Sequence, residues 1–295
     1  MALAEPALGA LLALGAAFTW AATSLLVRTL APPFSAVGLN AARTLAGGLL
    51  RWGWVLARGQ AGAVAAIGPT DLALLAVSIV VAIAIGDTAF FDSTRRLGLG
   101  RGMTIAMTYP LVAAGLAVGV LGEPVTGQFV LGAGLTLAGV FILVGGRRTE
   151  GEAGGRRGVG IVGAVVAALA WGVSSVLLKA PLREVDAVTA QAVRLPIAGL
   201  LLLGTPWARG VGAALAAAPG RVRARLALLG ALTAVSSVMF VAALKYAGVA
   251  IATVLSATAP LFAIPLGVLF LREPLTPAAL GGALITVAGI VVLQL

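Results

Sequence analysis

Asp87 is the side chain whose chemistry stands out most in this sequence, because it is an acid inside a long apolar run, residues 71–96. The residues three and four positions away from it are Ile83, Ala84, Phe90 and Phe91. No cation on its own helix can therefore neutralise it. Three interpretations stay open: a site for a proton or a substrate amine, a static ion pair with another helix, or a position nearer to water than the run indicates.

Arg43 and Arg194 form a second, matched candidate. Each follows a side-chain amide by three residues, Asn40 in one case and Gln191 in the other, so that amide and guanidinium share one helical face. One interpretation is that both arginines extend toward lipid headgroups or helix-end carbonyls. The other is that they line a pathway and meet a substrate carboxylate or Asp87.

Aromatic and further basic residues complete the candidate set. Aromatic side chains in these runs either form the apolar wall of a cavity or face lipid and neighbouring helices. Asp92 differs from Asp87, because Arg95 and Arg96 follow it at helical spacing and can pair with it locally. The candidate substrate-binding residues are Trp20, Asn40, Arg43, Asp87, Phe91, Arg95, Tyr109, Trp171, Gln191, Arg194, Phe240 and Lys245.

The chain contains an internal duplication, which relates many of these candidates to one another. From Phe90 onward many residues recur at a shift of 150, and up to Arg43 the shift is 151, so the first copy carries one extra residue between these positions. The pairs include Trp20 and Trp171, Arg43 and Arg194, Arg95 and Lys245, Pro110 and Pro260, and Glu123 and Glu273. We expect a first repeat at 1–145, a linker at 146–157 and a second repeat at 158–295.

Composition predicts an integral membrane protein that is all α-helical. The 295 residues are 60% hydrophobic and 10% charged, with a mean hydropathy of +1.10, and the apolar runs are continuous where a porin-like barrel would alternate. The first run lacks a basic leader, so we expect it to be retained. The predicted spans are 8–30, 34–56, 71–96, 101–121 and 126–145, followed by 158–180, 187–206, 226–245, 250–271 and 276–295.

Five spans per copy is an odd number, and this has a consequence for orientation. If both copies insert fully, the second enters the membrane from the opposite side, so that the two halves are inverted repeats about an axis in the membrane plane. Such halves meet at the midplane and can expose one site to either side in turn. The sequence therefore predicts ten transmembrane helices in two inverted five-helix repeats and an alternating-access carrier.

Missing residue types and motifs exclude several function classes. The chain has no Cys and no His, which removes thiol chemistry, a histidine base and most transition-metal sites, and we expect neither an enzyme nor a bound cofactor. It has no Gly-rich nucleotide-binding loop, which argues against a fused ATP motor. The net charge of +10 is assigned to loop arginines that set topology and contact anionic headgroups, with no nucleic acid as partner.

The order of several short motifs resembles a known family. The tryptophan of the opening helix, the segments 43–47 and 194–199, the sequence Ala243-Leu244-Lys245-Tyr246 and the repeated Glu-Pro are similar to the EamA-type branch of the drug/metabolite transporter superfamily. The likeness covers both repeats. It implies ten helices, a central cavity between the halves, a place in a bacterial-type inner membrane, and transport of small metabolites such as amino acids, usually outward.

We therefore expect a secondary transporter that exports or exchanges a small zwitterionic or anionic metabolite, with proton coupling as an open question. Alternatives are an organic-cation exporter, in which Asp87 is the main substrate contact, and a lipid flippase. Orientation is undecided: thirteen basic residues lie opposite the termini and five on their side, which places both ends outside, whereas the resemblance places them in the cytoplasm. Substrate identity and oligomeric state do not follow from the sequence.

Overall fold

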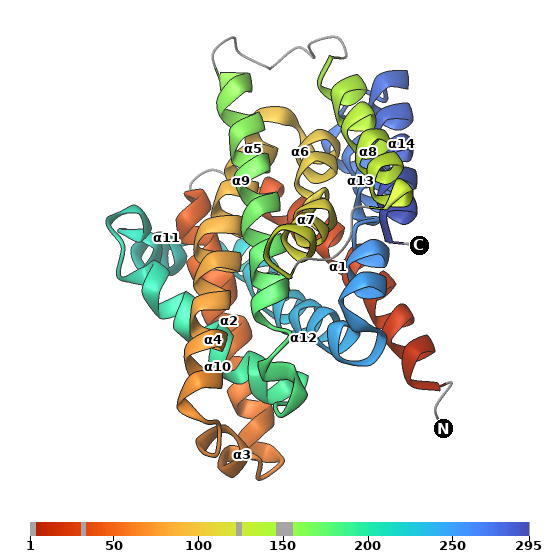
Figure 1. Cartoon of the computed structure of the whole chain (residues 1–295). Coiled ribbons are helices and arrows are strands. Elements are labelled where there is room, and N and C mark those ends of the chain that lie inside the picture. The colour runs from red at the N-terminus through yellow and green to blue at the C-terminus, as the bar shows by residue number, and fades with distance from the viewer. Residues whose placement is uncertain (1–3, 31–33, 122–125, 146–155, 295) are drawn as a thin grey trace.

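The computed structural model describes residues 4–30, 34–121, 126–145 and 156–294, and every regular element in these ranges is a helix (Figure 1). The first copy contains α1 (Ala4–Leu30), α2 (Ala36–Ala57), α3 (Ala61–Ala65), α4 (Pro69–Ile79), a π-helical segment (Val80–Asp87), α5 (Thr88–Leu97), α6 (Leu99–Ala106), α7 (Tyr109–Leu121) and α8 (Gly127–Gly145). The second contains α9 (Arg156–Leu177), α10 (Ala187–Leu203), α11 (Val211–Ala217), α12 (Gly220–Ser256), α13 (Ala259–Leu271) and α14 (Pro277–Gln294). Most of the predicted linker and the first Glu-Pro, Glu123-Pro124, lie outside the described residues.

Helix length and composition mark a protein that crosses a membrane several times. Five helical stretches in the described part of the chain are long and apolar enough to span: Glu5–Leu30, Pro69–Leu97, Arg157–Leu177, Gly220–Val249 and Ile251–Leu271. A sixth is formed if α10 and the helical segment after it, bent by 84°, count as one span. Each of the ten predicted ranges overlaps a helix, but ten crossings remain a prediction.

The outer surface carries large apolar side chains that a soluble domain would bury. Phe141 is 79% exposed, Leu269 is 73% exposed and Phe270 is 64% exposed. These residues belong to α8 and α13, whose outward faces therefore suit contact with lipid tails.

Two helix breaks occur at equivalent places in the two copies. Gly98 separates α5 from α6 at φ +87°, and Gly248 interrupts α12 at φ +79°, a conformation that glycine adopts without strain. Further breaks precede Pro110 and Pro260, which cannot donate a backbone hydrogen bond. Each of the two breaks in the first copy thus has an equivalent at the matching position of the second copy.

The two copies pack against each other as a twofold relation requires. α2 packs on its own equivalent α10, and α8 packs on its equivalent α14, side by side at one edge of the molecule in Figure 1. α1 of the first copy packs on α12 of the second. The equivalent contact with the roles of the copies exchanged, α9 of the second copy on α5 of the first, is also present. At the closest approach of α8 and α14, a Cβ on Gly139 would collide with Thr286, and one on the matching Gly289 would collide with Thr136. A twofold axis relating the copies produces such exchanged contacts.

The π-helical segment accounts for the extra residue of the first copy. Val80–Asp87 lies in the interval where the repeat shift changes from 151 to 150, whereas the equivalent part of α12 is α-helical. A π turn closes its hydrogen bonds from i to i+5 and so holds one residue more than an α turn. The first copy absorbs its additional residue here, and Asp87 lies at the end of this segment.

Candidate functional site

A cavity lies between the two copies and is lined by α1, α2, α4, the π-helical segment, α5, α6 and α7 of the first, and by α9, α10 and α12 of the second. Its lining residues are Trp20, Thr23, Ser24, Arg43, Ile79, Ala82, Ile83, Asp87, Phe90, Phe91, Met103, Met107, Tyr109, Trp171, Ser174, Ser175, Gln191, Arg194, Thr233, Ser236, Ser237 and Phe240. About 90 Å³ is open to the centres of water molecules, and one water needs roughly 10–15 Å³ on this measure. The cavity therefore has room for several waters or a small solute.

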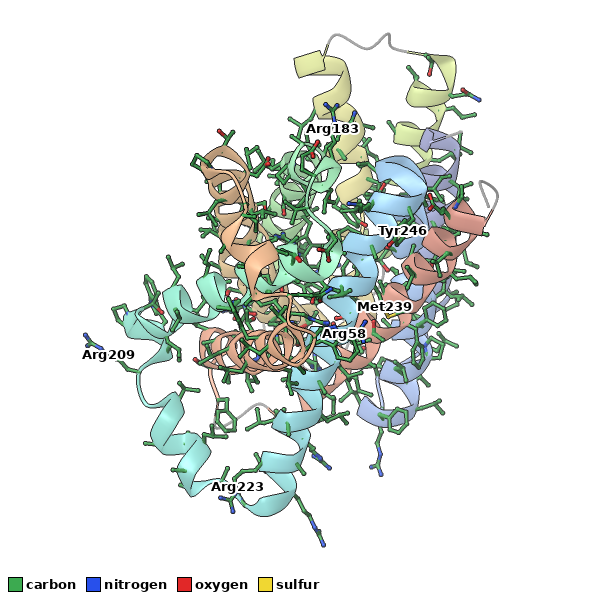
Figure 2. The ribbon with its side chains drawn as sticks, turned by 90° about the horizontal axis from the view of Figure 1, so that it is seen from below. Arg58, Arg183, Arg209, Arg223, Met239 and Tyr246 are labelled. Carbon is green, nitrogen blue, oxygen red and sulfur yellow. The ribbon has the colours of Figure 1, made fainter. Side chains whose placement is uncertain are left out.

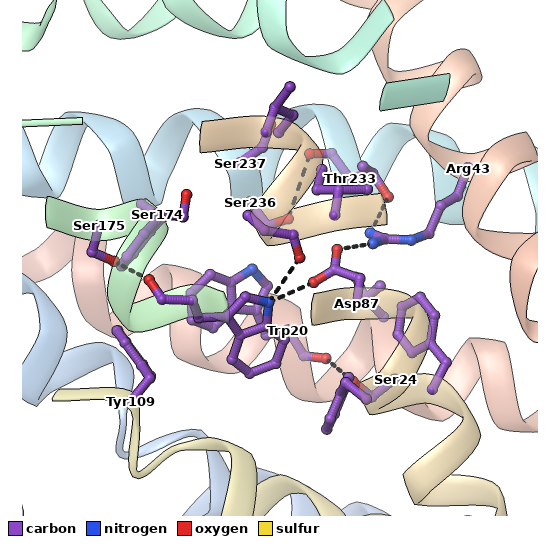
Figure 3. A pocket seen from close by; sticks show the side chains of 18 of the residues that line it. Trp20, Ser24, Arg43, Asp87, Tyr109, Ser174, Ser175, Thr233, Ser236 and Ser237 are labelled. Atoms are coloured by element: carbon purple, nitrogen blue, oxygen red, sulfur yellow. Dashed lines mark hydrogen bonds and ion pairs between the residues drawn. The ribbon is translucent and has the colours of Figure 1, made fainter. Parts of the chain in front are cut away.

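Asp87 lies between the two copies, and both of its carboxylate oxygens accept hydrogen bonds. Its carboxylate accepts a hydrogen bond from a terminal nitrogen of Arg43, with which it forms an ion pair, and its other oxygen accepts one from the indole Nε1 of Trp171 at 2.8 Å (Figure 3). Arg43 comes from the same copy and Trp171 from the other. Of the interpretations left open by the sequence, the interhelical pair is the one that the structure displays.

Arg43 is held in place by neutral groups as well as by Asp87. Its Nε donates to Asn40 at 3.0 Å, one terminal nitrogen donates to the hydroxyl of Thr233 at 3.3 Å, and the guanidinium lies over the ring of Phe91 at 4.7 Å. The side chain is 6% exposed. The arginine therefore faces the cavity and does not extend to headgroups.

Arg194 occupies the equivalent place in the second copy but has different partners. It donates to the amide oxygen of Gln191 at 2.9 Å, to Ser78 at 3.1 Å and to Ser174 at 3.3 Å. It is 4% exposed, and no described carboxylate lies within ion-pair distance of it. Among the described residues, the guanidinium of Arg194 thus has neutral hydrogen-bond acceptors only, and Asp87 is the acid that lines the same cavity.

Aromatic rings form the apolar wall of the cavity. Trp20 and its equivalent Trp171 stack with ring centroids 6.1 Å apart, and Phe240 lies 4.9 Å from Trp20. Tyr109 meets Trp171 and Phe240 edge-on, at 6.2 and 6.3 Å. The wall is therefore built from both copies.

Three candidates lie away from the cavity. Asn40 is fully buried behind Arg43, where its amide nitrogen donates to the carbonyl oxygen of Ile83 at 2.7 Å. Arg95 donates to the carbonyl oxygen of Phe34 at 3.2 Å. Lys245 makes the equivalent contact in the other copy, donating to Val185 at 3.1 Å. Asn40 supports Arg43 and the π-helical segment, while the other two join helix ends to the preceding connections.

Small hydroxyl residues of the cavity were not among the candidates. The signal for some of them is the duplication: Thr23 and Ser24 match Ser174 and Ser175, three and four positions after the two tryptophans. The hydroxyls of Ser24 and Ser175 donate to the carbonyls of Trp20 and Trp171 at 2.7 and 2.8 Å. Thr233, Ser236 and Ser237 add a third group on α12. Hydroxyls in apolar helices are common, so type alone did not single them out.

The groups around the cavity can recognise a small charged solute. One carboxylate, two guanidinium groups, an amide and several hydroxyls surround a small space with aromatic walls. No group of three or more Asp, Glu, His or Cys in the described residues could hold a metal ion. The two arginines can bind a carboxylate or similar anion, and Asp87 can accept a proton or an amine.

Comparisons with known proteins agree with this architecture. The model described as the EamA-like transporter family matches the chain twice, at residues 7–145 and 158–295. A solved structure titled "Crystal structure of protein" is 18% identical, covers 98% of each chain and has a TM-score of 0.66, which shows the shared fold. No curated protein matches the chain. Both matched segments together span nearly all residues, so this multi-pass membrane protein belongs to the EamA-like transporter family, within the drug/metabolite transporter superfamily.

Proposed function

We propose that this protein is a secondary active transporter that exports or exchanges a small metabolite carrying a carboxylate, of the amino-acid or anionic class, across a bacterial-type inner membrane. It works without a cofactor and is not an enzyme. The central cavity is the substrate site, and two inverted five-helix halves expose it to either side in turn. The observation that carries the proposal is the state of Arg194.

Arg194 is a buried cation whose hydrogen-bond partners in the described residues are all neutral. A buried charge is stable only when it is paired and hydrogen-bonded, so the free cavity favours the entry of an anion. Since guanidinium binds carboxylate in a two-pronged geometry, a substrate carboxylate is the natural counterion. Arg43 and Arg194 together exceed Asp87 by one positive charge, which one carboxylate would cancel.

Asp87 supplies the second half of the recognition. A zwitterionic substrate would place its amine near the carboxylate of Asp87, whereas a proton on Asp87 would release Arg43 from its ion pair. Substrate and proton then compete for the same carboxylate, and this competition couples transport to a proton gradient. The small volume and the tryptophan wall favour a compact solute with an apolar portion.

The twofold packing supports alternating access. The cavity is lined by both copies, and α1 packs on α12 as α9 packs on α5, so in the proposed mechanism motion of one copy against the other would open either end without rebuilding the site. Ten spans in two inverted halves are the topology that this motion requires.

Two equivalent positions test the inversion directly. Ala61 and Gly212 are both exposed, match at a shift of 151, and lie on opposite faces of the membrane in the ten-span topology. The chain has no Cys, so single Ala61→Cys and Gly212→Cys variants can be treated with an impermeant maleimide in intact cells. Inversion predicts labelling of one variant only. Labelling of both, or of neither while both react after lysis, contradicts it.

Substrate class is tested by thermal shift of the purified protein against amino acids, dicarboxylates and cationic dyes, followed by counterflow in proteoliposomes. A ligand at 100 times its dissociation constant stabilises by about 2.7 kcal/mol. The proposal expects stabilisation by a carboxylate compound in the parent and clearly less stabilisation at the same ligand concentration in Arg194→Gln. Stabilisation that is equal in both proteins would remove Arg194 from the site.

An organic-cation exporter is the second candidate, and a specific feature favours it. The carboxylate of Asp87 adjoins Trp171, which stacks on Trp20, and a carboxylate beside aromatic faces suits a cationic ligand. This function would require Arg43 to leave Asp87. Cationic dyes in the same screen separate the two candidates, because they should stabilise Arg194→Gln at least as well as the parent.

A further inference from the structure

The two tryptophans of the central cavity repeat the exchanged contacts of the two copies. The ring centroid of Trp171, from the second copy, lies 5.2 Å from that of Phe90, from the first. Trp20 of the first copy lies 4.9 Å from the matching Phe240 of the second. The planes of the two stacked indoles are 20° apart. The twofold relation between the copies therefore holds inside the cavity, and each indole can be compared with its equivalent.

The two indole N–H groups differ in what they bind. The N–H of Trp171 donates to the carboxylate of Asp87 at 2.8 Å and to the carbonyl oxygen of Ala82 at 3.2 Å. The N–H of Trp20 has no hydrogen-bond partner in the described part of the chain, although this partly buried side chain lines the cavity. An indole N–H usually binds an acceptor when it is buried, so the N–H of Trp20 is available to a ligand.

The acid that Trp171 binds has an equivalent that is not an acid. Ser237 matches Asp87 at the shift of 150, is partly buried and lines the cavity. Its hydroxyl donates to the carbonyl oxygen of Ala234 on its own helix at 3.2 Å. A serine side chain is shorter than an aspartate and carries no charge, so the second copy lacks the carboxylate that the first copy supplies.

Arg194 retains donors for such a carboxylate. Three of its five N–H groups donate to neutral side chains, and one N–H on each terminal nitrogen has no partner in the described residues. Arg43, by contrast, donates from a terminal nitrogen to Asp87. The second copy thus has equivalents of both groups that bind Asp87, an arginine and an indole N–H, without an acid between them.

We propose that the carboxylate of the substrate binds in the second copy where the side chain of Asp87 lies in the first, held by Arg194 and the N–H of Trp20. This assignment rests on the proposed function, because it takes the central cavity as the substrate site. The substrate amine then points across the twofold axis toward Asp87. A dicarboxylate would bring its second acid group toward Asp87, where like charges repel, so the site selects a zwitterion or a monocarboxylate.

The first test needs no substrate. Ser237→Asp puts a protein carboxylate into the subsite, whereas Ser237→Asn puts a neutral group of nearly the same size there. In the ligand-free protein we expect a higher unfolding temperature for Ser237→Asp than for Ser237→Asn, and no such difference once Arg194→Gln is added to both. The proposal is overturned if the two variants are equally stable, or if the difference persists without Arg194.

The second test uses the matched variants Trp20→Phe and Trp171→Phe, which keep an aromatic ring and remove the N–H. The probes are L-leucine, isocaproate, which is leucine without the amine, and isoamylamine, which is leucine without the carboxylate. Thermal shift of the full-length protein should show both carboxylates binding roughly tenfold more weakly to Trp20→Phe than to the parent, with isoamylamine unaffected. Without ligand, Trp20→Phe should lose less stability than Trp171→Phe, because its N–H has no protein partner to lose.

A surface arginine gives the control for charge alone, since Arg209 and Arg223 extend away from the body of the molecule (Figure 2). Arg209→Gln should leave the binding of all three probes unchanged. Carboxylate binding that depends on Arg194 but not on Trp20→Phe or Ser237→Asp contradicts the subsite and leaves the proposed function in place. If neither carboxylate stabilises the parent, the proposed function loses this substrate class, and the ligand-free comparison at position 237 decides the subsite by itself.

Discussion

Arg43 and Arg194 occupy the same place in the two copies and yet lie in opposite electrostatic situations. Each donates to the amide oxygen of the residue three positions before it, Asn40 or Gln191. Arg43 then meets a carboxylate, whereas Arg194 meets hydroxyls. At the shift of 150, the second copy carries Ser237 where the first carries Asp87, and Ser237 also lines the cavity. Both copies therefore contain the arginine and its amide partner, whereas only the first copy has a carboxylate, Asp87, beside its arginine.

The largest effect is expected from Asp87→Asn. This substitution removes the carboxylate that distinguishes the surroundings of Arg43 from those of Arg194. Loss of the carboxylate leaves Arg43 buried without its counterion, and breaking a buried pair in this way costs about 3–5 kcal/mol. We expect a large drop in the thermal unfolding temperature. Any active protein that remains should exchange substrate passively and fail to accumulate it against a pH gradient in proteoliposomes.

The double variant Arg43→Gln/Asp87→Asn is the control for that result. With both charges removed, much of the lost stability should return, because no unpaired charge remains. If Asp87→Asn alone is as stable as the parent and accumulates substrate equally well, the ion pair has no role in folding or coupling.

Arg194→Gln should change binding and leave stability nearly unchanged or improved, in contrast to Arg43→Gln. The removed cation had no described counterion, so folding loses no ion pair, whereas a substrate carboxylate loses a charge-assisted contact of about 1.5–3 kcal/mol. The expected result is a 10- to 100-fold weaker apparent affinity in counterflow. Arg194→Lys should recover part of it. Equal stability losses in Arg43→Gln and Arg194→Gln would erase the difference between the copies.

The helix break at Gly98 allows a further test of how one copy supports the other. Glu273→Ala removes the acceptor of Leu99 N–H and the partner of Arg28, so we expect a loss of about 1–2 kcal/mol. Asp92→Asn, which only breaks a pair between residues four apart on α5, should cost about 0.3–0.5 kcal/mol. Thermal unfolding of both variants in one detergent gives the comparison, and equal losses would mean that Glu273 makes only a surface contact.

An effect smaller than that of Glu273→Ala is expected at the equivalent helix caps Ser35 and Asp186. Burial raises the pKa of Asp186, but hydrogen bonds from Thr189 and from the N–H of Val188 outweigh it and hold the pKa below its usual range. A lowered folded-state pKa gives stability that is present above the unfolded pKa and is lost as pH falls through the folded one. Asp186→Ala should cost up to about 1 kcal/mol near neutral pH and less in acid.

Ser35→Ala removes the cap of α2, in which Ser35 accepts from Gly38 N–H at 2.9 Å. Because a hydroxyl does not titrate in this range, its cost should be the same at pH 3 and pH 7. The measurement is the unfolding temperature of both variants and the parent across that range. A pH-independent loss in Asp186→Ala would show that its charge contributes nothing to the cap.

Residue types and spacing were sufficient to predict the helical membrane class, the repeat and the family, because hydropathy and a fixed shift are properties of the sequence itself. They also placed Arg43, Arg194 and their amides on shared faces, since that needs only helical geometry. The partner of Asp87 stayed open, because contacts between helices depend on packing and not on local spacing.

The π-helical segment has a consequence for how such an asymmetric site can arise. The carbonyl oxygens of Ala82 and Ile83 within it accept hydrogen bonds from Trp171 and Asn40, so the wider turn is stabilised by the side chains that surround the cavity. The two coding copies differ in this interval by a net of three nucleotides. The π segment accommodates the added residue, so the helix can keep its contacts at both ends. The side chains within the segment then point in directions that differ from those of their equivalents in α12. A very small genetic change can in this way separate two halves that began alike.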